Sequence, residues 1–348
     1  MSPASSLRAE AAKRILIKDG AYGTQVQERR LQEGDYRGAL DLAKDQRGNN
    51  DLLNLTKPEL VHSICESFAD AGAEILATNT FNANAISQAD FGAEALVPQI
   101  NRASAEIVRG VADARSAKDG KPRWVAGAMG PTNKTLSLSP NVNDPAFREV
   151  DFDQVKAVYR EQVDALVGGG VDFILIETIF DTLNAKAAIM ATLEAEQALG
   201  RELPLMISMT LTDLSGRNLS GHTVEAFWAS VRHAKPITIG LNCSFGAAQL
   251  RPHLAALSAI ADTLVMAYPN AGLPNELGEY DEAAEQTAAQ VRDWATSGLV
   301  NIVGGCCGTT PLHIAAIAGA VRDCTPRTVP AARSGTLLAG LEPMVIAA

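Results

Sequence analysis

The chain has 348 residues, of which 47% are hydrophobic, and a formal net charge of −10 at pH 7. This length allows one large core, and the acidic balance argues against nucleic acid or an anionic membrane as a partner. Residues 1–15 lack the apolar region of a secretory signal, and no segment approaches the roughly 18 apolar residues of a membrane span. With only five cysteines, which we expect to be reduced, the composition predicts a cytoplasmic protein.

Eight short apolar segments follow one another along the chain and are predicted to be β-strands. Their nearly continuous apolar character is typical of strands that are buried on both faces of a parallel sheet. They cover residues 15–17, 75–77, 124–126, 173–176, 205–207, 237–240, 263–266 and 301–303.

Amphipathic segments between these strands are predicted to be helices. Examples are 58–71 with Thr56 as the N-cap, 152–167, 182–199, 282–296, and a helix that begins at Pro311 after Thr309 or Thr310. The alternation predicts a (β/α)8 TIM barrel forming a single domain over residues 1–348, with the barrel proper at 13–325. The tail, 326–348, is expected to wrap the barrel or fray. A doubly wound sheet is the alternative, because periodicity alone does not show closure.

Polar residues follow the apolar segments at the predicted carboxyl ends of the strands. In a barrel these ends converge on one mouth, where active sites lie. The residues are Asp19, Gly20, Asn79, Glu177, Cys243, Asn270, Cys306 and Cys307. Two long connections, 23–56 and 130–150, lie on the same face and are expected to be lids or docking surfaces.

Three thiols at two strand ends form a candidate metal site. Cys243, Cys306 and Cys307 could hold zinc and leave its fourth position for a ligand. An all-sulfur shell favours a thiolate substrate over a zinc-bound hydroxide, which points to alkyl transfer onto sulfur. The alternatives are that the cysteines are ordinary small buried residues, or that the glycine-rich turn 304–308 binds phosphate through its amides.

Acids and amides near these thiols are candidate substrate ligands. Asp19 and Glu177 could bind an ammonium group, although capping or ion pairing is an equally good explanation. Asn79 and Asn270 could orient a substrate or fill the fourth zinc position, although asparagine at a strand end is often a turn residue. Cys65 and Cys324 are interpreted as structural.

Taken together, nine segments of the chain resemble the homocysteine-binding module of cobalamin-dependent methionine synthase, in the homocysteine S-methyltransferase family. They are 19–24 (DGAYGT), 48–53 (GNNDLL), 74–81 (EILATNTF), 130–133 (GPTN), 143–148 (NDPAFR), 176–188 (IETIFDTLNAKAA), 240–244 (GLNCS), 269–275 (PNAGLPN) and 302–311 (IVGGCCGTTP). The resemblance extends from about residue 15 into the tail.

The resemblance implies a (β/α)8 barrel with catalytic zinc on Cys243, Cys306 and Cys307, and homocysteine bound to the zinc through its sulfur. It places Asp19 and Glu177 around the amino-acid end of homocysteine. It also places Gly20, Thr24 and Asn79 in mouth motifs, and it lets Asn270 fill the fourth zinc position when homocysteine is absent. Tyr22 departs from the smaller or aliphatic residue that is usual in the first loop.

The resemblance also predicts how the methyl group arrives. The chain covers only the first module of methionine synthase and lacks the D-x-H-x-x-G motif that ligates cobalamin. We therefore expect methylcobalamin on a separate corrinoid protein, together with a methyltetrahydrofolate- or betaine-handling protein. The alternatives are direct use of betaine, and a non-catalytic zinc barrel that acts as a subunit of a methyl-transfer complex.

Overall fold

The computed structural model describes residues 2–276, 278–332 and 335–346. Eight parallel strands form one sheet in the order β1-β8-β7-β6-β5-β4-β3-β2. They are β1 (Leu16–Ile17), β2 (Ile75–Ala77), β3 (Trp124–Met129), β4 (Phe173–Ile179), β5 (Leu205–Met209), β6 (Thr238–Gly246), β7 (Leu264–Asn270) and β8 (Ile302–Val303). A parallel bridge between Lys18 and Ile75 joins the two ends of this order. The predicted (β/α)8 barrel is confirmed, and the doubly wound alternative is wrong.

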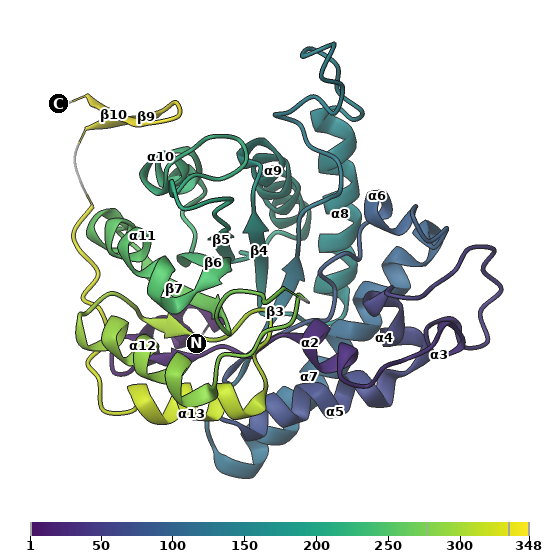
Figure 1. Cartoon of the computed structure of the whole chain (residues 1–348), viewed down its shortest axis with the longest axis horizontal. Coiled ribbons are helices and arrows are strands. Elements are labelled where there is room, and N and C mark those ends of the chain that lie inside the picture. Colours follow the sequence, from purple (N-terminus) through teal and green to yellow (C-terminus); the bar gives the residue numbers. More distant parts are fainter. Residues whose placement is uncertain (1, 277, 333–334, 347–348) are drawn as a thin grey trace.

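Helices surround the central strands (Figure 1). The main ones are α5 (Pro58–Asp70), α7 (Val97–Asp119), α8 (Phe152–Gly168), α9 (Thr182–Leu199), α10 (Val224–Val231), α11 (Ala247–Ile260), α12 (Ala284–Thr296) and α13 (Pro311–Val321), preceded by α1 (Pro3–Ala11). Local sequence explains their ends: Asp151 and Gln154 form a capping box at the start of α8, and Gly200 adopts a left-handed conformation after α9. The predicted helices 152–167 and 182–199 are confirmed to within one residue.

Two predicted helix starts are wrong. The N-cap of α5 is Lys57 instead of Thr56. Thr56 ends a preceding short helix, α4 (Leu53–Thr56), and its hydroxyl donates to the carbonyl of Leu52. The helix expected from residue 282 starts at Ala284, because the carboxylate of Glu282 instead accepts hydrogen bonds from side chains of α12, including that of Thr287.

Large apolar side chains fill the barrel interior below the mouth. They come from alternate positions of the strands, since successive residues of a strand point to opposite faces. The cluster includes Leu16, Ile75, Trp124, Phe173, Met206, Met266, Tyr268 and Ile302. The opposite faces of the strands pack against the helices in a second, larger cluster. The interior is therefore solid, and ligands have access only near its ends.

The tail forms a hairpin that the sequence analysis did not predict. Strands β9 (Thr336–Ala339) and β10 (Pro343–Ile346) pair antiparallel and lie beside α10, where the amide of Thr223 donates to the carbonyl of Leu341. The described part of the tail therefore packs against the barrel, in agreement with one of the two expectations. Residues 333–334 and 347–348 lie outside the described residues. The division into a barrel at 13–325 and a tail stays a prediction.

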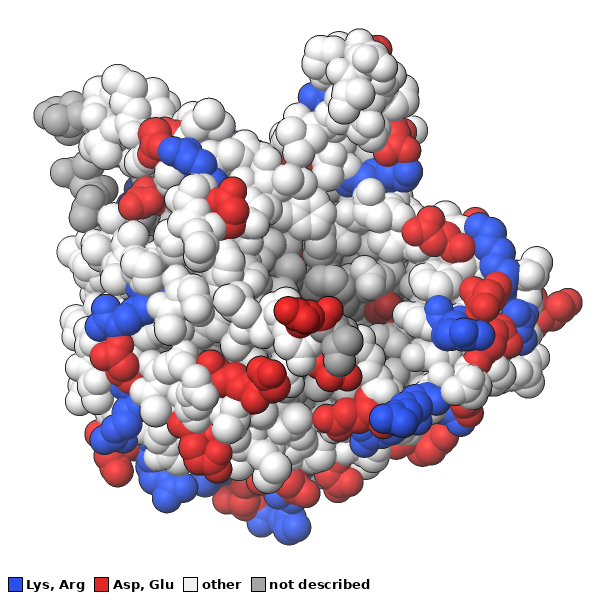
Figure 2. Space-filling model, in the orientation of Figure 1, with Lys and Arg blue, Asp and Glu red and all other residues white. Residues whose placement is uncertain are grey.

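The two long connections differ in structure. Residues 23–56 are folded into short helices, α2 (Tyr22–Gln27), α3 (Glu33–Arg37) and η1 (Asn50–Leu52), followed by α4. Residues 130–150 contain no helix or strand and project beyond the start of α8 (Figure 1). On the face drawn in Figure 2 this projection is largely uncharged, while acidic and basic side chains are interspersed elsewhere.

Candidate metal and substrate site

The three predicted thiols lie together at the barrel mouth. The sulfur atoms of Cys243, Cys306 and Cys307 are all within 4.8 Å of one another, and each cysteine is half-buried. The sulfurs of Cys243 and Cys307 are 3.8 Å apart. Two thiolates on one tetrahedral zinc, with bonds of about 2.3 Å, lie roughly 3.8 Å apart. The spacing therefore suits a single metal ion.

An unusual backbone conformation places Cys243 in this cluster. Cys243 and Ser244 have φ angles of 60° and 64°, a left-handed region that non-glycine residues rarely adopt. The pairing of β6 with β7 is irregular over the same residues. The Ser244 hydroxyl accepts from the amide of Leu211 at 2.8 Å and also bonds to the hydroxyl of Thr210. These contacts hold a strained turn that brings the Cys243 sulfur toward β8.

The turn after β8 presents the other two thiols. The amide of Cys306 donates to the carbonyl of Pro269, and the carbonyl of Cys307 accepts from the amide of Ala271, so the end of β7 and the residue after it hold both cysteines. Gly308 has a φ of 80°, and a Cβ there would lie 2.2 Å from the Cβ of Tyr280. A glycine is therefore required for Tyr280 to pack over the turn.

The turn is poorly suited to the phosphate alternative. The amides of Gly304, Gly305, Cys306, Gly308 and Thr309 already donate to acceptors within the protein. A phosphate-binding loop instead needs free amides pointing at its ligand. Thr310 caps α13 through a capping box with His313, as predicted for one of the two threonines.

Charge distribution within the cluster favours a bound cation. Hydrogen bonds with Cys243 and Cys306 lower the pKa of Cys307, whereas hydrogen bonds with Cys243 and Cys307, together with burial, raise the pKa of Cys306. Without a cation, the crowded sulfurs therefore favour a single thiolate. A divalent ion would let all three ionise.

Asn270 offers an additional ligand next to the turn. It is the last residue of β7 and is 2% exposed. Its buried side-chain oxygen has no hydrogen-bond partner in the described part of the chain. Such an orphaned acceptor is costly unless a ligand satisfies it. Together with the sulfur spacing, this atom fits a metal site with three thiolates and one exchangeable position.

The two predicted acids have different surroundings. Asp19 is fully buried, and its carboxylate accepts from the Lys18 ammonium at 2.8 Å and from the amide of Ala77 at 2.7 Å. Glu177 is 9% exposed and accepts from the hydroxyl of Tyr268 at 3.0 Å. Burial raises the pKa of Glu177, opposed by the Lys18 charge and the Tyr268 hydroxyl.

The other predicted residues, Gly20, Thr24 and Asn79, follow the first two strands and pack around the mouth. The Thr24 hydroxyl accepts from the amide of Gly308 at 2.9 Å. Gly20 lies so close to α5 that a Cβ would approach the Phe68 ring to 2.7 Å. The side-chain amide of Asn79 donates to the carbonyl of Asn50, so it holds the first long connection. Their direct contact with a substrate stays a prediction.

Sequence analysis assigned no role to three buried polar residues, Lys18, Asn242 and Tyr268. Lys18 lies over the Tyr268 ring, 4.6 Å from its centroid, and Asn242 connects Thr178 and Ser208. Two of these residues could have been found from the alternation of inward and outward side chains along a strand. Lys18 shares the inward face of β1 with Leu16, and Tyr268 shares the inward face of β7 with Met266.

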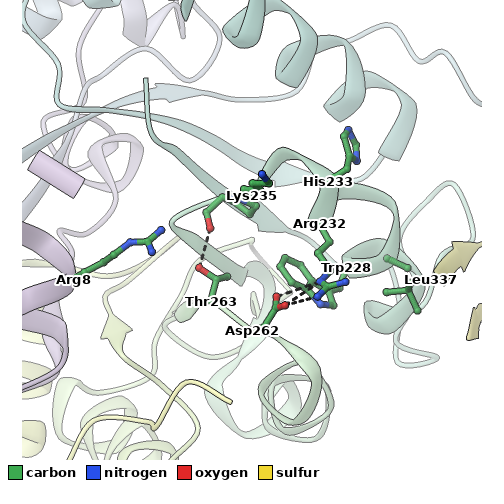
Figure 3. A pocket seen from close by; sticks show the side chains of 10 residues that line it. Arg8, Trp228, Arg232, His233, Lys235, Asp262, Thr263 and Leu337 are labelled. Atoms are coloured by element: carbon green, nitrogen blue, oxygen red, sulfur yellow. Dashed lines mark hydrogen bonds and ion pairs between the residues drawn. The ribbon is translucent and has the colours of Figure 1, made fainter. Parts of the chain in front are cut away.

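A different hollow lies at the opposite end of the barrel. It has a volume of about 550 Å³ and is lined by Arg8, Arg232, His233 and Lys235, among others. Figure 3 shows the ion pair between Arg232 and Asp262, which precedes β7. Because catalytic residues of such barrels lie at the carboxyl ends of strands, this hollow is not the predicted site.

The fold and the cluster define a (β/α)8 barrel with a three-thiol site at its mouth. A sequence model of the homocysteine S-methyltransferase family matches residues 16–321, and the chain belongs to that family. None of the helices in the described ranges is long and apolar enough to cross a membrane.

Two solved structures of one bacterial protein share the fold. The metallated form of the homocysteine methyltransferase MmuM from Escherichia coli gives a TM-score of 0.70 at 24% identity, covering 90% of this chain and 99% of that chain. The oxidized form gives 0.71 at 22% identity, covering 92% and 99%.

Proposed function

We propose that the protein is a zinc-dependent methyltransferase that converts homocysteine to methionine, with Cys243, Cys306 and Cys307 as the metal ligands. The observation that carries this proposal is the cluster of three sulfurs within 4.8 Å in a member of the homocysteine S-methyltransferase family. A metallated relative with the same fold also supports it.

Zinc on these thiolates would lower the thiol pKa of homocysteine and keep its sulfur as a thiolate. The thiol proton leaves to solvent when homocysteine binds. A sulfur–carbon bond then forms to the methyl group while the bond from that methyl to its donor breaks, and the donor keeps the electron pair. No acid is needed at the leaving group, so the chain mainly binds and orients the two reactants.

The methyl donor is proposed to be methylcobalamin on a separate corrinoid protein. The loops around the mouth support a macromolecular donor, because they expose large apolar side chains. In the loops, Val142 after β3 is 93% exposed and Leu214 after β5 is 74% exposed; at the start of α13, Leu312 is 75% exposed. In this proposal the donor protein would contact these exposed apolar side chains, whereas betaine, as a small donor, would not need them.

A donor assay tests this function. Zinc-loaded protein is incubated with homocysteine and either methylcobalamin or betaine, and methionine is measured. We expect methionine with methylcobalamin only; methionine with betaine alone would replace the proposed donor.

The matched controls are Cys306→Ala, which should lose zinc and activity together, and Cys324→Ala, which removes a thiol outside the cluster and should keep both. An active zinc-free Cys306→Ala protein would refute the metal mechanism. Stoichiometric zinc that is unaffected by homocysteine, without methionine formation, would favour the non-catalytic subunit.

A further inference from the structure

A side-chain amide is buried beside the thiol cluster. Asn242 precedes Cys243 on β6 and is 1% exposed. Its oxygen accepts from the amide of Thr178 at 3.1 Å and from the hydroxyl of Ser208 at 2.7 Å. Its nitrogen donates to the hydroxyl of Thr178 at 2.8 Å and to the sulfur of Cys306 at 3.8 Å. All four hydrogen-bonding positions of this side chain are therefore used.

The backbone of Thr178 determines which end of the Asn242 amide faces the sulfur. A peptide N–H can only donate, so the side-chain oxygen of Asn242 has to lie beside the amide of Thr178. The reversed orientation would set two donors against each other. The NH2 group therefore lies on the side of Cys306, and that sulfur faces an N–H donor.

Strained backbone segments surround this side chain. Thr178 has a φ of 58°, which is an outlier for a β-branched residue, and Asn242 bonds to both its amide and its hydroxyl. Cys243 and Ser244, which follow Asn242, are also left-handed. Such strain persists where the surrounding structure fixes it, and it is concentrated at functional sites. Because β4, β5 and β6 all hold Asn242, its donor has a fixed direction.

The proposed reaction requires selectivity among sulfurs. With homocysteine on the metal, the methyl donor meets the substrate thiolate beside three protein thiolates. Cys243, Cys306 and Cys307 are all half-buried, so burial class alone does not protect them. A hydrogen bond to a thiolate stabilises its charge more than it stabilises the alkylation transition state, in which that charge has moved into the new bond. The N–H group of Asn242 therefore makes Cys306 harder to alkylate.

We propose that Asn242 is a positioning residue that directs the Cys306 sulfur and weakens it as a nucleophile, so that methyl transfer goes to homocysteine and not to the protein. This inference rests on the proposed zinc site. The backbone of Cys306 is already held, because its carbonyl accepts from the amide and the hydroxyl of Thr309. The contact with Asn242 fixes the freedom that remains, which is the direction of the side chain.

Alkylation of the zinc-loaded protein by iodoacetamide tests this role without homocysteine or a methyl donor. In each event a sulfur–carbon bond forms, the carbon–iodine bond breaks, and iodide leaves with the electron pair. Fragmentation of the peptides in a mass spectrometer gives the rates at Cys243, Cys306 and Cys307 separately. The other two cysteines are therefore internal standards for Cys306.

Two variants remove the donor. Asn242→Asp keeps the shape and the oxygen that accepts from Thr178, and Asn242→Ala removes the whole amide. Ser208→Ala is the matched control, because it removes another hydrogen bond of Asn242 and leaves the contact with Cys306. In wild type, Cys306 should be the slowest of the three sulfurs. Both Asn242 variants should raise its rate about fivefold relative to the other two, whereas Ser208→Ala should keep the wild-type ratio.

An unchanged ratio in the Asn242 variants would overturn the inference. Equal acceleration at all three sulfurs would also overturn it, since that result means that Asn242 only keeps the site closed. If neither Asn242 variant folds, the wild-type order decides, and a Cys306 that is not the slowest sulfur contradicts the proposal. Metal analysis accompanies each measurement, and a wild type that holds no zinc would instead refute the proposed function.

Discussion

Thr24 and Gly308 are joined by a hydrogen bond between the first and the last loops of the barrel mouth, with the Gly308 amide donating to the Thr24 hydroxyl at 2.9 Å. The bond links residues that are 284 positions apart in sequence. Because Gly308 directly follows Cys307, this contact fixes the turn that presents two of the three thiols.

Replacing Thr24 with valine should therefore weaken metal binding. The valine keeps the shape of the side chain but leaves the Gly308 amide without its acceptor, which costs about 1–3 kcal/mol. We expect zinc affinity, measured by competition with a chromophoric chelator, to fall about tenfold. Thr24→Ser keeps the hydroxyl and should bind zinc as wild type does. Equal zinc affinity in Thr24→Val and wild type would show that the bond does not hold the turn.

Substitution at Gly308 should be more damaging than at a matched glycine. Gly308 and Gly120 have similar φ angles, 80° and 72°, but a Cβ at Gly308 would meet Tyr280 whereas one at Gly120 meets nothing within 4 Å. Gly120→Ala should therefore cost about 1 kcal/mol from backbone strain alone.

Gly308→Ala adds a steric clash beside the thiols and should lower both the melting temperature and the zinc content after dialysis. The two variants are compared by thermal melting and metal analysis. If Gly308→Ala kept its zinc and had the same melting temperature as Gly120→Ala, the close packing of Tyr280 would not be needed for the metal site.

Asp51 predicts a pH dependence of stability. Its carboxyl is buried and accepts from the amide of Asn82, and burial raises its pKa from 3.8 to about 7. A raised folded-state pKa means that the folded protein binds the proton more tightly than the unfolded chain. Stability is therefore full below the unfolded value and is lost as pH rises toward about 7, by up to roughly 4 kcal/mol for this group.

Asp51→Asn removes the ionisable group and keeps an oxygen for the Asn82 amide. We expect it to unfold at higher denaturant concentration than wild type at about pH 8, and the difference to shrink toward about pH 4. Urea unfolding at several pH values measures this. Parallel pH profiles for the two proteins would contradict a buried proton on Asp51.

The positions of the strands were predictable because parallel barrel strands are apolar throughout. The extent of β6 was not predictable, because its last residues depend on the left-handed backbone at Cys243 and Ser244. No local sequence pattern predicts that conformation. The hairpin of the tail was also missed, since its pairing is settled by contacts with α10, far away in sequence.

The thiol cluster was predicted correctly as a group, because all three cysteines follow apolar strands that end at one mouth. The environment of Asp19 was not predicted, because the side chain of a lysine at a strand end, such as Lys18, usually reaches solvent. Only the closed barrel shows that Lys18 points inward, toward Tyr268 and Asp19.

The central claim is that homocysteine binds through its sulfur to a metal held by Cys243, Cys306 and Cys307. X-ray absorption at the zinc edge, recorded with and without homocysteine, counts the sulfur ligands. The account predicts three sulfurs and one lighter ligand in the free protein, and four sulfurs with homocysteine. A sulfur count that homocysteine does not change, in protein carrying one zinc per chain, would contradict it.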